Sequence, residues 1–111
     1  MSSERREHER FELIAQVELS YGGPVEKFVT INISAGGLLL RNDRDVKLTL
    51  GDSIRVSFDA PELAPPFVIE AKIVRVVAPT SKPGLFGAMW KSTDATANAA
   101  LSQILWNLRK P

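Results

Sequence analysis

Three arginines close to the N-terminus are the first residues whose chemistry points to a ligand. Arg5, Arg6 and Arg10 lie in a run of charged residues that includes one histidine. A guanidinium is a rigid fork of donors that matches a phosphate or the O6/N7 edge of guanine, and its flat face can stack on a base. Because this run has no periodic apolar face, we expect residues 1–10 to form a mobile arm that folds over a ligand.

A second polar group lies further along the chain, at Asn32, Ser34 and Gly37. Asn32 and Ser34 are two positions apart, so on a strand both side chains leave the same face, opposite the apolar Ile33. We therefore expect an amide and a hydroxyl side by side on the outer surface. Gly37 has no side chain, which permits close approach of a ligand to the backbone. Together these groups suit a purine with an acceptor edge and phosphates.

Both groups also have a purely structural interpretation. Arginines in a polar terminus are usually solvated, and Asn and Ser next to glycines commonly form the turn at the end of a strand. Gly36 and Gly37 could mark only a bulge. The single histidine, His8, lies between two glutamates. We expect it to be exposed, since a lone histidine without other His or Cys makes a poor metal site.

The elements that must position these groups follow from the period-two alternation of apolar and polar residues. A first strand is predicted from Phe11 to Tyr21, followed by a Gly-Gly-Pro turn. In the second strand, with Phe28 out of phase, one buried face is expected to hold Val25, Val29, Ile31 and Ile33. Further strands are predicted at Leu38–Arg41, Ser53–Asp59, Phe67–Val77 and Leu85–Trp90, with a bulge at Ile73–Val74.

A change of period after the last strand predicts a helix over about residues 93–109, with Ser92, Thr93 or Asp94 as its cap. The apolar stripe expected to pack on the strands consists of Ala97, Leu101, Ile104, Leu105 and Leu108. Six short strands and one terminal helix predict a mainly β fold. We expect a six-stranded antiparallel barrel with a C-terminal helix, formed by residues 11–111.

Composition excludes several classes of function. The chain has 111 residues, no cysteine, and 14 Lys and Arg against 13 Asp and Glu. One domain of this size is expected, without disulfides, thiolate metal sites or a cysteine nucleophile. The net charge of +1 argues against binding to a nucleic acid polymer, so any anion site must be local. No apolar run is long enough for a membrane helix, and we expect a cytoplasmic protein without membrane insertion.

The two polar groups, taken together, resemble a known family signature. Arg6-x-x-x-Arg10 followed by Asn32-x-Ser34-x-x-Gly37 is similar to the two-part motif of the PilZ domain, R-x-x-x-R and then D/N-x-S-x-x-G. PilZ domains bind the bacterial second messenger cyclic di-GMP. The resemblance covers nearly the whole chain, including the predicted barrel and C-terminal helix. It implies a single-domain PilZ protein whose ligand is cyclic di-GMP, with no further cofactor.

The resemblance also implies a role for each residue of the motif. Arg6 and Arg10 would grip guanine edges and phosphates. Asn32 and Ser34 would hydrogen-bond a guanine or its phosphate surroundings. Gly37 would let the ring approach the backbone. Since Asn32 is neutral where many members have Asp, its contact with a guanine amino group is expected to be weaker.

The same resemblance implies a role in ligand binding for two further arginines. Arg41, four residues after Gly37, matches a basic position that some members use. Arg5 immediately precedes the motif, at a position that influences whether one cyclic di-GMP or an intercalated pair is bound in the family. A bulky basic residue favours the pair. We therefore expect two ligands per chain, with Arg5 offsetting the repulsion between their phosphates.

The function implied is that of a receptor or adaptor that changes conformation on binding and signals to a protein partner, which the sequence does not identify. One alternative is a PilZ-fold interaction module that does not bind the nucleotide. An enzyme is not expected, because the chain shows no catalytic triad, paired carboxylates or metal cluster. An oligonucleotide-binding barrel would need exposed aromatic residues and a basic groove, whereas Trp90 and Trp106 are expected to pack in the core or on the helix.

Overall fold

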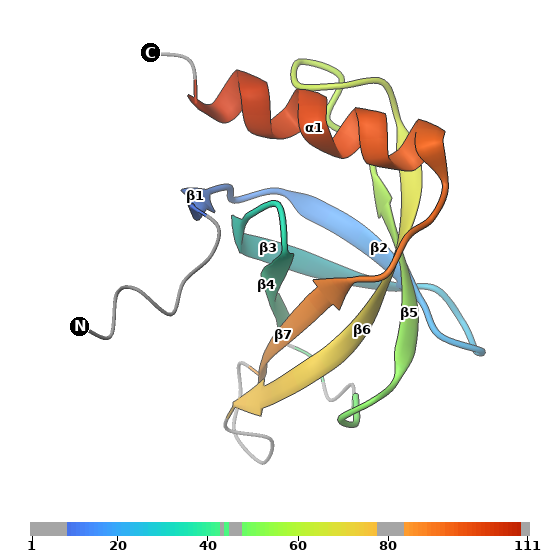
Figure 1. The fold of residues 1–111 in the computed structure, drawn as a ribbon. Helices are drawn as coiled ribbons and strands as arrows, with labels where there is room; N and C mark the ends of the chain where they lie inside the picture. Colours follow the sequence, from blue (N-terminus) through green and yellow to red (C-terminus); the bar gives the residue numbers. More distant parts are fainter. Residues whose placement is uncertain (1–8, 43, 45–47, 78–83, 110–111) are drawn as a thin grey trace.

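Six antiparallel strands close into a barrel in the order β3-β2-β5-β6-β7-β4, with β4 pairing back onto β3 (Figure 1). The structure is a computed structural model that describes residues 9–42, 44, 48–77 and 84–109. The elements are β1 Phe11–Glu12, β2 Gln16–Ser20, β3 Glu26–Ile33, β4 Gly37–Asn42, β5 Ser53–Phe58, β6 Phe67–Val77, β7 Gly84–Trp90 and α1 Ala95–Arg109. The mainly β barrel with a C-terminal helix is therefore confirmed.

The barrel interior is filled by the inward-facing residues of each strand, as the alternating pattern requires. Phe28 meets Phe86 edge to face with ring centroids 6.1 Å apart, which connects β3 to β7 across the intervening strand β4. Phe58 stacks on Phe67 at 5.0 Å, which joins the neighbouring strands β5 and β6. The two aromatic pairs thus link β3 to β7 and β5 to β6 inside the barrel. The largest fully buried side chains include Phe28, Leu19, Leu40, Ile54 and Ile69.

The strand predicted from Phe11 to Tyr21 is in fact two, β1 and β2, and Thr30 occupies the break. The Thr30 hydroxyl accepts a hydrogen bond from the Ala15 amide at 3.0 Å and donates to the Leu13 carbonyl at 2.5 Å. The pairing with β3 changes from Glu12 opposite Asn32 to Gln16 opposite Val29, so three residues of one chain segment face two of the other. This extra residue interrupts the ladder and separates the two strands.

The predicted inner face of the second strand is wrong for Val25, Val29 and Ile31. Val25 lies before β3 and is 59% exposed, while Val29 and Ile31 are only half-buried. A register shift between Thr30 and Asn32 makes Ile31 a bulge residue. The strand therefore points Phe28, Thr30 and Ile33 inward, and Asn32 outward. The bulge predicted at Ile73–Val74 is confirmed by a similar shift in β6.

Helix α1 follows β7 after a short connection and lies across one end of the barrel (Figure 1). Asp94 caps it, because its carboxylate accepts from the Thr96 amide at 3.2 Å. The predicted stripe packs as expected: Ala97, Leu101 and Ile104 are buried, and Leu105 and Leu108 are partly buried against the same core. The helix contacts β6 and β1, and no described helix is long and apolar enough to cross a membrane.

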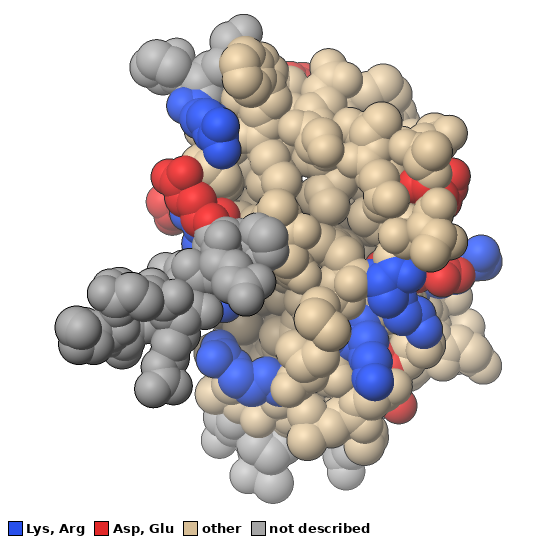
Figure 2. Space-filling model, viewed as in Figure 1, with Lys and Arg blue, Asp and Glu red and all other residues tan. Residues whose placement is uncertain are grey.

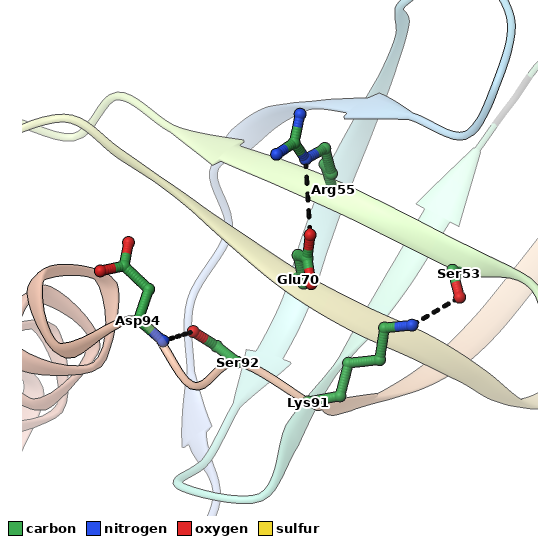
Figure 3. A network of polar contacts seen from close by, with 6 residues as sticks. All are labelled: Ser53, Arg55, Glu70, Lys91, Ser92 and Asp94. Atoms are coloured by element: carbon green, nitrogen blue, oxygen red, sulfur yellow. Dashed lines mark hydrogen bonds and ion pairs between the residues drawn. The ribbon is translucent and has the colours of Figure 1, made fainter.

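A small polar network holds the segment between β7 and α1 on the outer surface of β5 and β6 (Figure 3). Lys91 donates from Nζ to the Ser53 hydroxyl at 2.6 Å, and its amide donates to the Glu70 carbonyl. Next to it, Arg55 and Glu70 form an ion pair at 3.7 Å across the two strands. Lys91 and Arg55 thus each have a polar partner on the outer surface of β5 and β6.

Candidate ligand-binding site

Arg10 and Asn32, one residue from each half of the predicted motif, are in contact in the structure. Arg10 lies directly before β1, and its Nη1 donates a hydrogen bond to Oδ1 of Asn32 at 3.4 Å. The pairing of Glu12 with Asn32 brings Arg10 to this position. The bond is long and exposed to solvent, so it contributes little to folding. The bond shows that the Arg10 guanidinium and the Asn32 amide lie side by side on the outside of the barrel.

Ser34 does not stand on the open outer face beside Asn32, so the position predicted from the spacing is wrong for this residue. It follows the last residue of β3 and is only 8% exposed. Its hydroxyl oxygen accepts from the Gly36 and Gly37 amides at 3.1 and 3.2 Å, so it shapes the turn between β3 and β4. The structural interpretation of the Asn-x-Ser spacing therefore holds for Ser34, whereas Asn32 projects outward as predicted.

The packing of β4 against β7 leaves no room for a side chain at position 37. A Cβ at this position would lie 2.0 Å from the carbonyl oxygen of Ala88, which belongs to the neighbouring strand β7. Backbone atoms cannot yield as a flexible side chain can. The backbone that approaches Gly37 closely is therefore that of β7. The fold itself requires glycine at this position, whether or not Gly37 also contacts a ligand.

Trp90 belongs to the site, although its sequence pattern predicts only core or helix packing. Its indole Nε1 donates to the Ser34 carbonyl at 2.9 Å, and its amide donates to the Gly36 carbonyl at 3.0 Å. The last residue of β7 thus holds the turn that follows Asn32. The chemistry of Trp is one signal for this role in the sequence, since a partly buried indole N–H needs an acceptor.

Arg41 lies on the same outer surface as the Arg10–Asn32 pair. Along β4, Gly37, Leu39 and Arg41 alternate with buried residues, so they share the outer face. Leu39 pairs with Asn32 across the sheet, and Arg41 pairs with Val29 and Leu85. Arg41 is half-buried and stands two residues along β4 from the partner of Asn32. Arg5 and Arg6, in contrast, lie outside the described residues.

The charged side chains of the described residues form no single broad basic patch on the face shown in Figure 2. On the face shown in Figure 2, the Lys and Arg side chains stand in separate groups around uncharged surface. No cluster of three or more metal-ligating residues occurs among residues 9–42, 44, 48–77 and 84–109. Burial, with the nearby Glu26 and Asp52 carboxylates, raises the pKa of Tyr21, but Tyr21 adjoins the end of β3 opposite to Asn32.

A comparison with protein families decides the membership of this chain. The model of the PilZ domain matches residues 4–105, which includes Arg6, Arg10, Asn32, Ser34 and Gly37. The chain belongs to the PilZ domain family. The PilZ fold expected from the resemblance is thereby confirmed along with the family itself. A comparison with curated proteins finds no match.

Solved PilZ structures share this architecture. The PilZ domain of CeSA from a cellulose-synthesizing bacterium matches with a TM-score of 0.73 at 16% identity, covering 92% of this chain and 99% of that one. The PilZ domain of YcgR from Escherichia coli, solved with c-di-GMP, matches with a TM-score of 0.71 at 14% identity, covering 94% and 91%. At these identities the likeness shows the fold.

The same PilZ fold also occurs within longer proteins. The Bacillus subtilis inhibitor of motility MotI (DgrA) matches with a TM-score of 0.72 at 23% identity, covering 96% of this chain but 54% of that one. This chain thus spans about half the length of MotI. The likeness therefore concerns the matched half of MotI and its fold alone.

Proposed function

We propose that this PilZ domain is a receptor for cyclic di-GMP. The observation that carries the proposal is the contact between Arg10 and Asn32, which joins the two halves of the PilZ motif at one place on the barrel surface. The PilZ domain of YcgR and the PlzA protein of Borreliella burgdorferi have both been solved with c-di-GMP, which supports the choice of ligand.

The chemistry of the site suits both parts of this ligand. Arg10 offers a fork of donors to a phosphate or to the O6/N7 edge of guanine. Asn32 can accept from the guanine amino group and donate to an acceptor on the same base. Arg41 adds a cation on the same surface, two residues along β4 from the partner of Asn32. Ser34 supports ligand binding by holding the turn after Asn32, and its hydroxyl is also proposed to contact the ligand.

We further propose that residues 1–10 form a ligand-binding arm and that residues 11–111 form the barrel domain. Arg5 and Arg6 on the arm would contact the ligand from the side opposite to the barrel. Because the arm leads into β1, and β1 contacts α1, a closed arm changes the surface around the helix that a partner meets. The output is signalling to a protein effector in the cytoplasm, by binding rather than catalysis.

Two ligands are proposed to bind as an intercalated pair. A stacked pair concentrates four phosphate charges, and Arg5, Arg6, Arg10 and Arg41 together supply a matching number of guanidiniums. Calorimetric stoichiometry or native mass spectrometry measures the number bound. One ligand per chain at saturation would contradict the pair, and an Arg5→Ala variant that still takes two would show that Arg5 does not hold them.

The decisive experiment is a calorimetric titration of the purified protein with cyclic di-GMP, with cyclic di-AMP and GTP as comparison ligands. Saturable binding of cyclic di-GMP alone supports the proposal. Arg10→Ala should reduce the affinity about tenfold to a hundredfold, because it removes a charge-assisted contact. Arg109 is an exposed arginine at the end of α1. Arg109→Ala is therefore the matched control, and it should leave the affinity unchanged.

The absence of binding by the wild-type chain would contradict the proposal and favour the alternative function. In that case the PilZ fold would serve as an interaction module without the nucleotide. Wild-type affinity in Arg10→Ala would contradict only the placement of the site. Circular dichroism of each variant checks that the barrel has folded.

A further inference from the structure

A row of paired residues runs across five strands of the outer surface and ends at an arginine outside the PilZ motif. The register pairs Glu12 with Asn32, Asn32 with Leu39, Leu39 with Gly87, and Gly87 with Arg75. Directly paired residues of a sheet have their side chains on the same face. Arg75 on β6 is thus on the surface that carries Asn32, with β4 and β7 between them (Figure 1).

Two bulges bring Asn32 and Arg75 to the outside. In β3, Phe28 and Thr30 point inward, so strict alternation would also bury Asn32; the bulge at Ile31 turns it outward. In β6, the odd-numbered residues from Phe67 to Ile73 are buried, and the bulge at Val74 turns Arg75 outward in the same way. Bulges that redirect side chains are common beside functional sites.

The strip between Asn32 and Arg75 consists of Leu39 and Gly87, and neither residue is charged. Leu39 is half-buried, and Gly87 has no side chain. A Cβ at Gly87 would lie 3.3 Å from Cβ and 3.9 Å from Nε of Arg75, so the Arg75 side chain lies over β7. It is exposed, and no hydrogen bond or ion pair joins it to another residue within the described part of the chain. Arg55, on the next strand, has Glu70 as its partner instead.

We propose that Arg75 is a further ligand-binding residue, which donates to a phosphate or guanine acceptor at the end of the ligand opposite to Arg10. The proposal rests on the proposed function. Asn32 and Arg75 lie three strand spacings apart, about 14 Å between backbones. Gly87 adds no side chain of its own to the strip, which leaves room for the Arg75 side chain to lie over β7 and point toward Leu39. Arg10 and Arg75 therefore approach the strip above Leu39 and Gly87 from opposite sides.

The test measures the affinity for cyclic di-GMP by calorimetry. Arg75→Ala should weaken binding about tenfold to a hundredfold, the range expected for a lost charge-assisted hydrogen bond. Arg55→Ala removes the same charge from an exposed position on β5 and should change the affinity by less than about twofold. Both variants should melt near the wild-type temperature, because both side chains are exposed.

A second variant tests the position of Arg75 rather than its charge. Gly87→Ala places a methyl group against the Arg75 side chain and should weaken binding by displacing it. In an Arg75→Ala background the same change should have a much smaller effect. Full additivity of the two losses would overturn the role of Gly87 in placing Arg75.

The outcomes separate this inference from the function on which it rests. Binding by the wild type with unchanged affinity in Arg75→Ala would overturn the role of Arg75 and leave the proposed receptor intact. No binding by the wild type would overturn the receptor and this inference together. Equal losses of affinity in Arg75→Ala and Arg55→Ala would show a general effect of charge. That result would also overturn a specific contact between Arg75 and the ligand.

Discussion

The indole Nε1 of Trp90 and the carbonyl oxygen of Ser34 lie 2.9 Å apart and form a hydrogen bond. The bond joins the last residue of β7 to the turn between β3 and β4, far away along the chain. It fixes the turn that follows Asn32 at the edge of the proposed ligand site. The site therefore depends on β7 as well as on the residues of the PilZ motif.

Trp90→Phe tests this relationship, because it keeps an aromatic ring and removes the donor. We expect a loss of about 1–3 kcal/mol in the free energy of unfolding, since the Ser34 carbonyl loses a partner and a smaller ring fills the space. Urea denaturation measures the change. Trp106→Phe is the control, because Trp106 is 59% exposed. Its loss should be within about 0.5 kcal/mol. Equal effects of the two changes would contradict the role of the Trp90 bond.

Gly37→Ala is expected to be among the most damaging single substitutions in the barrel. The new Cβ would meet the Ala88 carbonyl oxygen at 2.0 Å, so β4 and β7 would have to separate. We expect destabilisation of about 3 kcal/mol or more, or failure to fold, as for severe overpacking. The melting temperature and the yield of soluble protein report the result.

Gly23→Ala is the matched control for Gly37→Ala. Gly23 lies in the turn between β2 and β3, and nothing lies within 4 Å of the position of its Cβ. This change should be neutral or should stabilise the protein slightly, by about 0.4–1 kcal/mol, because it restricts the unfolded chain. A Gly37→Ala variant as stable as Gly23→Ala would show that β4 and β7 do not approach as described.

Thr30→Val should destabilise the protein although it preserves the shape of the side chain. The Thr30 hydroxyl serves both the Ala15 amide and the Leu13 carbonyl at the break between β1 and β2. Removing it should cost about 1–3 kcal/mol, the penalty for leaving buried backbone groups without that partner. Thr96→Val, at an exposed position of α1, should cost much less. Chemical denaturation of both variants distinguishes them, and equal stabilities would contradict the structural role of Thr30.

The strands at Ser53–Phe58, Phe67–Val77 and Gly84–Trp90 and the helix α1 could be predicted almost to the residue. Their signal is local. β5, α1 and β6 up to Ile73 each follow one period, whereas β7 is a short apolar run, and polar or proline-rich segments flank these elements. The inner face of β3 could not be predicted, because both sets of alternating residues contain apolar side chains. The bulge at Ile31 decides between them, and the break opposite Thr30 belongs to a distant segment.

The proposed site was predictable only as far as its residue types. The motif indicates Arg10 and Asn32, and their contact agrees with it, but nothing local shows that Ser34 turns inward to bind the Gly36 and Gly37 amides. No motif or local pattern points to Arg75. It shares a surface with Asn32 only because two separate bulges and the ring order place it there.

Ser34→Ala should affect both stability and ligand affinity, which differs from the expectation for an exposed residue of a binding surface. The hydroxyl accepts from two amides of the turn. Its loss should therefore cost about 1–3 kcal/mol of folding free energy. A looser turn also displaces Asn32, so the affinity for cyclic di-GMP should fall. Urea denaturation and calorimetry on the same sample give both quantities.

Ile33→Ala provides the contrast, because Ile33 is fully buried and its side chain points away from the proposed site. We expect a larger loss of stability, about 2–5 kcal/mol, from the cavity it leaves. Below the melting temperature of that variant, the affinity should change less than in Ser34→Ala, because the turn keeps its hydroxyl bonds. If Ile33→Ala loses more affinity than Ser34→Ala while still folded, the turn around Ser34 is not what holds Asn32 in place. If Ser34→Ala leaves both stability and affinity unchanged, the hydroxyl contacts with Gly36 and Gly37 contribute to neither.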